Sequence, residues 1–147
     1  MQSLKLFWLV FCLIAAVSVE AKRKRMSVGA RGTLICSGKR LEGATINLYP
    51  DQTGKFETRM GTTVSGKDGS FAIQGSSTDY VTFKPMIVIE HQCRTAKCRR
   101  RVSISLPEES YTVGSKPNSL FDMSEIDFTD KYPSEFMVCP NRPPKKF

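Results

Sequence analysis

Side chains that perform catalysis or hold a metal ion are scarce in this sequence. It contains one histidine, His91. It has no Gly-x-Ser-x-Gly segment, which marks the nucleophile of many hydrolases, and no loop with the ligand spacing of an EF-hand calcium site. The interpretation favoured for His91 is a hydrogen-bonded histidine in or beside the core, and the alternatives are a catalytic base or a ligand. We therefore expect a protein that is not an enzyme and that uses no cofactor and no metal.

Long apolar segments with the period of a helix are also missing after the first twenty or so residues. Residues 134–138 are the one candidate for a helical turn. Residues 44–49 instead alternate apolar and polar side chains, and Lys67-Asp68-Gly69 is a hairpin turn signal. The pattern predicts an all-β fold, a small antiparallel β-sandwich of about seven short strands.

Two of the expected strands contain irregularities. Residues 81–93 carry alternate apolar side chains and read as the longest strand, with Pro85 forcing a bulge or an edge position because proline cannot donate to the ladder. Phe121 and Met123 have one parity, whereas Ile126 and Phe128 have the other. A β-bulge between Met123 and Ile126 would bring all four side chains to one face.

The first 21 residues have the layout of a secretory signal peptide, with Lys5 ahead of an uncharged apolar run and a cleavage site after Ala21. An uncleaved membrane anchor is the alternative. We expect a secreted, extracellular protein that does not span the membrane. It would consist of a basic N-terminal arm (residues 22–27), one domain (residues 28–139) and a disordered basic, proline-rich tail (residues 140–147).

Four cysteines remain after the leader, and an even number in a short exported domain indicates disulfide bonds. The preferred pairing is Cys93–Cys98, which would close a tight loop, with Cys36–Cys139 joining the first strand to the C-terminal segment. Four cysteines allow three connectivities, and the sequence does not choose among them. A zinc site is the competing interpretation. It is disfavoured because no second close ligand pair accompanies Cys93 and Cys98.

The chain resembles the nematode transthyretin-like proteins, a family of small secreted domains. The matching residues, in order, are Arg31-Gly32-Thr33-Leu34-Ile35-Cys36, Gly38-Lys39, Lys67-Asp68-Gly69-Ser70-Phe71, residues 85–89, His91, Cys93, Cys98, Leu106-Pro107, Tyr111, Gly114, Phe121-Asp122 and Cys139. The resemblance implies a transthyretin (prealbumin)-like sandwich, secretion, and a role in binding. The hydroxyisourate hydrolases, which are enzymes related to transthyretin, use more than one histidine, so their activity is not carried over.

Basic residues give the clearest functional lead. The formal net charge is +8, and five cations gather around the expected Cys93–Cys98 loop: Arg94, Lys97, Arg99, Arg100 and Arg101. On a strand, Arg99 and Arg101 would face one way and Arg100 the other. The cluster could bind an anionic lipid head group, a sulfated glycan or an acidic protein. The alternative is an edge whose charges only prevent aggregation. Nucleic acid is not expected, because the chain is exported and aromatic residues do not alternate with the basic ones.

Three functions follow, in order of preference. The first is a secreted binding or bridging module that uses this basic loop to recognise a partner or an anionic surface. The second is a carrier of a small hydrophobic ligand, as transthyretin is. The third is a hydrolase that depends on His91.

Overall fold

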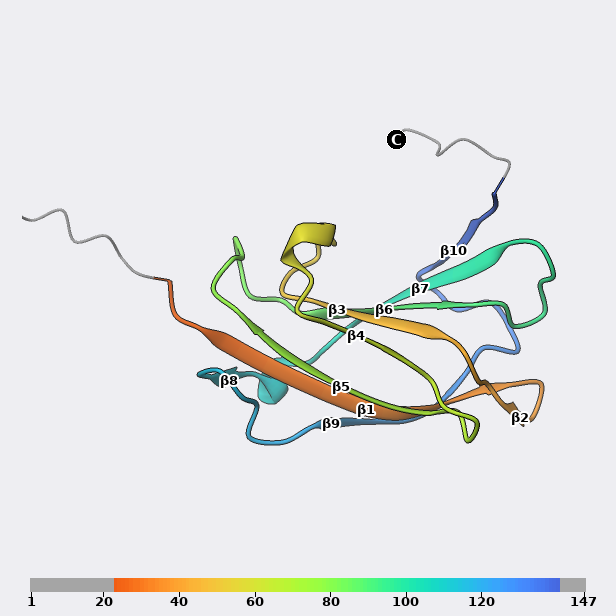
Figure 1. Ribbon diagram of the computed structural model, residues 1–147, viewed down its shortest axis with the longest axis horizontal. Coiled ribbons are helices and arrows are strands. Elements are labelled where there is room, and N and C mark those ends of the chain that lie inside the picture. Colours follow the sequence, from red (N-terminus) through yellow and green to blue (C-terminus); the bar gives the residue numbers. More distant parts are fainter. Residues whose placement is uncertain (1–22, 141–147) are drawn as a thin grey trace, which may run out of the picture.

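The computed structural model describes residues 23–140. They form two stacked β-sheets (Figure 1). The C-terminal ends of β1 and β6 lie at the same end of the molecule. Sheet A contains β1 (Met26–Cys36), β2 (Lys39–Arg40), β5 (Ser70–Ser77), β8 (Thr112–Val113) and β9 (Phe121–Asp127). Sheet B has the order β10 (Glu135–Val138), β7 (Arg99–Ser105), β6 (Met86–His91), β3 (Thr45–Tyr49) and β4 (Gly61–Val64). Two short 3₁₀ helices, η1 (Phe56–Thr58) and η2 (Glu108–Ser110), lie between strands.

The expected all-β sandwich is confirmed, with more strands than predicted. The count rises because β2 and β8 are two-residue strands that sequence patterns do not resolve, and because β10 was not predicted as a strand. Strand β9 runs parallel to β1, whereas every other strand pair in residues 23–140 is antiparallel. A parallel pair needs a long connection, and here most of the domain lies between the two strands.

The core lies between the sheets and follows the predicted alternation. Ile46 and Leu48 of β3 lie opposite Ile89 and Ile87 of β6, and all four side chains are fully buried. Because the side-chain period of a strand is two, this register also fixes which residues point outward. On β6 it directs His91 inward and Glu90 outward.

The predicted bulge in β9 is confirmed. Ser124 has a φ of 55°, and the β1–β9 register shifts between Arg31 and Thr33. The shift changes the parity of the strand, so Phe121, Met123, Ile126 and Phe128 all pack in or against the core.

Two sequence predictions of secondary structure are wrong. Strand β6 begins at Met86, directly after Pro85, and Val81 is 84% exposed instead of contributing to a core face. Residues 134–138 do not form a helical turn, because Glu135–Val138 is strand β10 and pairs with β7. Four residues are too few for a periodic pattern, so only the pairing with β7 defines this strand.

The N-terminal boundary differs by two residues from the expected one. Strand β1 begins at Met26, and Ser27 is fully buried, so the domain starts before Val28. The predicted signal peptide (residues 1–21) and all of the predicted tail except Pro140 lie outside the described residues. Within residues 23–140, no helix is long and apolar enough to cross a membrane.

Candidate binding surface at the disulfide-linked end

Two disulfides join the strands at one end of the sandwich. They link Cys36 to Cys93, with Cα atoms 5.7 Å apart, and Cys98 to Cys139, with Cα atoms 4.3 Å apart. The preferred pairing from sequence is therefore wrong. Cys36 ends β1 and Cys93 follows β6, so their bond connects sheet A to sheet B. Cys98 and Cys139 flank the paired residues Arg99 and Val138, so their bond closes the β7–β10 pair.

Both bonds close long loops instead of one long and one tight loop. The sequence separations are 57 and 41 residues. In the chain-entropy account, loops of this size restrict the unfolded chain by about 4 kcal/mol each. All four cysteines of the described chain are oxidised, so none is a thiolate ligand for zinc.

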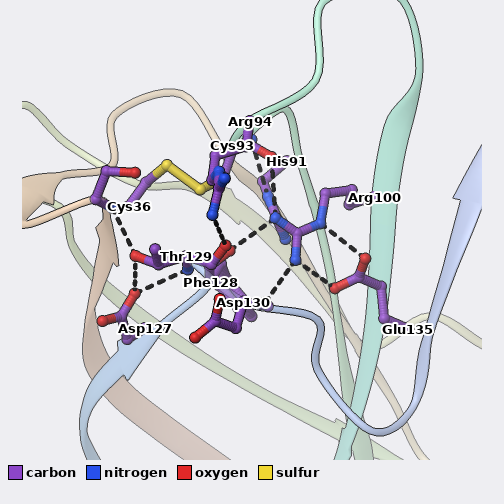
Figure 2. The surroundings of a disulfide bond; sticks show 11 residues. Cys36, His91, Cys93, Arg94, Arg100, Asp127, Phe128, Thr129, Asp130 and Glu135 are labelled. Atoms are coloured by element: carbon purple, nitrogen blue, oxygen red, sulfur yellow. Dashed lines mark hydrogen bonds and ion pairs between the residues drawn. A yellow bond between two sulfur atoms is a disulfide. The ribbon is translucent and has the colours of Figure 1, made fainter.

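Arg100 is the middle residue of the basic cluster, and its side chain is buried (Figure 2). Its Nε and Nη2 donate to the two carboxylate oxygens of Glu135 at 2.7 Å each. Nη1 donates to the carbonyl oxygens of Cys93 and Phe128 at 2.9 and 2.7 Å, and Nη2 also donates to that of Asp130 at 2.7 Å. A guanidinium has five N–H donors, and all five are used.

The contacts of Arg100 connect three separate segments. They are the loop after β6, the residues that follow β9, and the edge strand β10. The Glu135 carboxylate also accepts the backbone N–H of Tyr132 at 3.1 Å. Hydrogen bonding to Arg100 is the main cause that lowers the pKa of Glu135 below its usual value of 4.5. We call Arg100, Glu135 and the three carbonyl groups the arginine clamp.

His91 lies beside the clamp and is 3% exposed. The backbone N–H of Cys93 donates to its Nδ1 at 3.1 Å, so the proton of the neutral ring is on Nε2. Its ring stacks on Phe128 with centroids 4.2 Å apart, and Nε2 has no hydrogen-bond partner. Burial, followed by the charge of Arg100, lowers the pKa of His91 to about 4. At neutral pH it is a neutral core residue.

Arg99 and Arg101 point to the opposite face from Arg100, as the strand alternation predicted. Both interact with one carboxylate on the outer face of sheet B: Arg101 Nε donates to Glu90 Oε1 at 2.7 Å, and Arg99 Nη1 lies 3.7 Å from Glu90 Oε2. The Arg101 guanidinium also lies 5.5 Å from the centre of the Phe136 ring. The carboxylate of Glu90 therefore partly neutralises these two arginines.

The structure thus divides the predicted binding patch into three parts. Arg100 is buried and therefore unavailable to a partner. The structure thus corrects the prediction that placed it in the binding patch. Arg99 and Arg101 lie over Glu90. Arg94 and Lys97 remain as exposed cations, and Arg94 Nη1 donates to the carbonyl oxygen of Thr129 at 3.3 Å.

A surface groove of about 600 Å³ lies next to the clamp. Its rim carries Arg94 from the loop after β6 and Lys131 from the segment before β10. Arg100 and Glu135 contribute to its floor, while Phe136 and Met137 line it along β10. We call this feature the β10 groove. Sequence reasoning missed Lys131 and the two apolar residues, because nothing in the sequence placed β10 beside β7.

Most of the net charge is carried by residues near the two ends of the sequence. Residues 22–25 contribute four of the positive charges, and Arg142, Lys145 and Lys146 contribute three more of the net eight. The domain between these segments is almost balanced, so its ability to bind an anion depends on the arrangement of its charges.

A sequence model of the transthyretin-like family matches residues 31–107. The chain belongs to the transthyretin-like family. Transthyretin-like protein 33 of Caenorhabditis elegans is 26% identical over 136 residues, which cover 90% of this chain and 92% of the relative. Transthyretin-like protein 5 of the same organism is 28% identical over 134 residues, covering 89% and 96%. Transthyretin-like protein 2 is 24% identical over 132 residues, covering 84% and 89%.

The arginine clamp makes a prediction about stability. Arg100→Met leaves the Glu135 carboxylate buried without its partner, and we expect the free energy of unfolding to fall by about 3–5 kcal/mol. Arg100→Met combined with Glu135→Leu removes both charges and should recover part of that loss, since the three carbonyl groups still lack their donors. Urea denaturation of the oxidised protein measures each value. Arg99→Met, which alters only a partly exposed ion pair, is the control and should change stability by less than about 1 kcal/mol. Equal effects of Arg100→Met and Arg99→Met would contradict the clamp.

His91 predicts a pH dependence of stability. Because its pKa is about 4 in the folded state and 6.5 when unperturbed, the unfolded chain binds the proton more readily. The free energy of unfolding should therefore fall as the pH drops from about 6.5 to 4, by roughly 3 kcal/mol in total. Glu135 has a pKa lowered from 4.5, so it adds a further loss of stability from about pH 4.5 downward. The variant His91→Gln should flatten the slope between pH 6.5 and 4 in denaturation curves. An unchanged slope would show that His91 does not titrate as described.

Proposed function

We propose that this protein is a secreted, extracellular binding module that recognises an anionic partner or surface at its disulfide-linked end. The observation that supports this function is a group of three exposed cations, without carboxylate partners, that gather at this end of the domain. Arg94, Lys97 and Lys131 are exposed, and none of them forms an ion pair with a carboxylate within residues 23–140. Arg94 and Lys131 stand on the rim of the β10 groove, next to apolar side chains.

The rigidity of this end favours binding over a purely solubilising role. The two disulfides and the arginine clamp hold the loops that carry Arg94 and Lys131, so less conformational entropy is lost when a partner binds. A charge cluster that serves only solubility needs no such support. Secretion is consistent with the disulfides, which form and persist in oxidising compartments.

A second candidate function, the carriage of a small hydrophobic ligand, is favoured by another feature. A cleft of about 340 Å³ opens between β7 and β9, and half-buried apolar residues, among them Ile104, Phe121 and Met123, line it. The cleft is shallow relative to an enclosed cavity, and the carboxylates of Asp122, Glu125 and Asp127 stand around it. Because these charges oppose a purely apolar ligand, we rank this function second.

The proposed function is tested by binding of the oxidised protein (residues 22–147) to heparin, to phosphatidylserine vesicles and to phosphatidylcholine vesicles. The groove variant carries Arg94→Glu, Lys97→Glu and Lys131→Glu. The matched control carries Lys39→Glu, Lys67→Glu and Lys116→Glu, three exposed lysines elsewhere, so the change in net charge is the same. At about 0.15 M salt, we expect at least one anionic probe to bind and the groove variant to lose about tenfold in affinity, with little loss in the control.

Two results would contradict the proposed function. Equal losses in the groove variant and the control would mean that binding reflects net charge alone. A loss caused only by neutralising the terminal cations, Lys22, Lys24, Arg142, Lys145 and Lys146, would place recognition outside the domain.

A further inference from the structure

Strand β10 is an edge strand of unusual character. It pairs with β7 on one side, and no other strand of residues 23–140 pairs with its second side. Phe136, Met137 and Val138 are 50%, 52% and 38% exposed, so three consecutive apolar side chains lie at the surface. Proteins usually protect such edges with charges, proline or a covering segment, because their free N–H and C=O groups attract another strand. In Figure 1, β10 lies beside β7 at the end of sheet B.

The two faces of β10 have different chemistry. The side chains of Glu135 and Met137 lie on the face of β10 that Arg100 contacts, because residues two apart in a strand share a face. Phe136 and Val138 have the opposite parity and lie on the outer face of sheet B, where Arg101 stacks over Phe136. Glu135 and Met137 therefore face the arginine clamp, whereas Phe136 and Val138 form an apolar outer face, and Phe136 also contributes to the lining of the β10 groove.

The electrostatics of the groove select the sign of its ligand. Arg100 and Glu135 neutralise one another in the floor. The rim then carries two cations, Arg94 and Lys131, and one carboxylate, Asp130. Acidic side chains that enter the groove would meet Arg94 and Lys131, neither of which forms an ion pair within residues 23–140.

We propose that the free edge of β10 binds an extended segment of a protein partner as an additional strand of sheet B. Acidic side chains of that segment would alternate with apolar ones. The acidic residues would enter the β10 groove towards Arg94 and Lys131, and the apolar residues would pack on Phe136 and Val138. Strand addition combines backbone hydrogen bonds with side-chain selection at every second residue. This inference rests on the proposed function, because it names the class of partner for the same end of the molecule.

The alternation favours a polypeptide partner over a lipid or a glycan. A membrane or a sulfated glycan needs only the exposed cations and leaves the backbone edge of β10 unused. An extended peptide satisfies that edge and matches both faces at the two-residue period of a strand.

The test uses a fluorescently labelled peptide that alternates glutamate with valine and a control peptide with the same residues in a segregated order. Fluorescence anisotropy measures affinity for the full oxidised chain, and hydrogen exchange followed by NMR measures protection of the β10 amides. We expect the alternating peptide to bind at least about tenfold more tightly and to slow exchange of β10 amides that face away from β7. Phe136→Ser with Val138→Ser should lose about tenfold in affinity. Val64→Ser with Val113→Ser, two exposed valines elsewhere, should not.

The outcomes separate this inference from the proposed function. If both peptides bind equally and no β10 amide is protected, strand addition is wrong, although binding to heparin or vesicles through Arg94, Lys97 and Lys131 would still stand. If the Phe136/Val138 variant loses the peptide but keeps binding to those surfaces, the inference is supported independently. Protection of β10 that rises with protein concentration without peptide, together with a dimer in sedimentation, would identify a second copy as the occupant and overturn the proposal.

Discussion

A single buried guanidinium organises the end of the molecule where binding is proposed. Arg100 cannot be buried unless all of its donors are satisfied, because an unpaired buried charge is strongly destabilising. The loop after β6, the turn after β9 and strand β10 supply the acceptors, so each of these segments is held in position by the same side chain. Two of these segments also contribute to the core between the sheets, through Cys93 and Phe128.

The disulfides and the clamp act on the same segments in different ways. The bonds Cys36–Cys93 and Cys98–Cys139 limit how far the joined segments can separate. Arg100 fixes the orientation of the segments around it by directional hydrogen bonds. Together they hold the segments that carry Arg94 and Lys131, and both residues line the β10 groove. Because residues 26–140 have little net charge, the proposed binding depends on where these few cations are placed.

Much of the fold could be predicted from the sequence, since it depends on local patterns. The alternation of residues 44–49 and the change of parity between Met123 and Ile126 identified core faces and a bulge. The opposite orientations of Arg100 and its neighbours also followed from strand geometry. The sequence could not show that Arg100 is the arginine that faces inward, because this depends on its ion pair with Glu135, which is distant in sequence. The disulfide pairing and strand β10 likewise require contacts between β1 and β6 and between β7 and β10 that no local pattern contains.

The most direct measurement of the central claim is nitrogen-15 NMR of the arginine side chains in the oxidised protein. Hydrogen bonds from all donors of Arg100 should prevent rotation of its guanidinium and slow its proton exchange. We expect resolved, slowly exchanging Nη signals for Arg100, with averaged signals for exposed arginines such as Arg94. Averaged, rapidly exchanging Nη signals for Arg100 would show that its side chain is solvated and that the arginine clamp does not form.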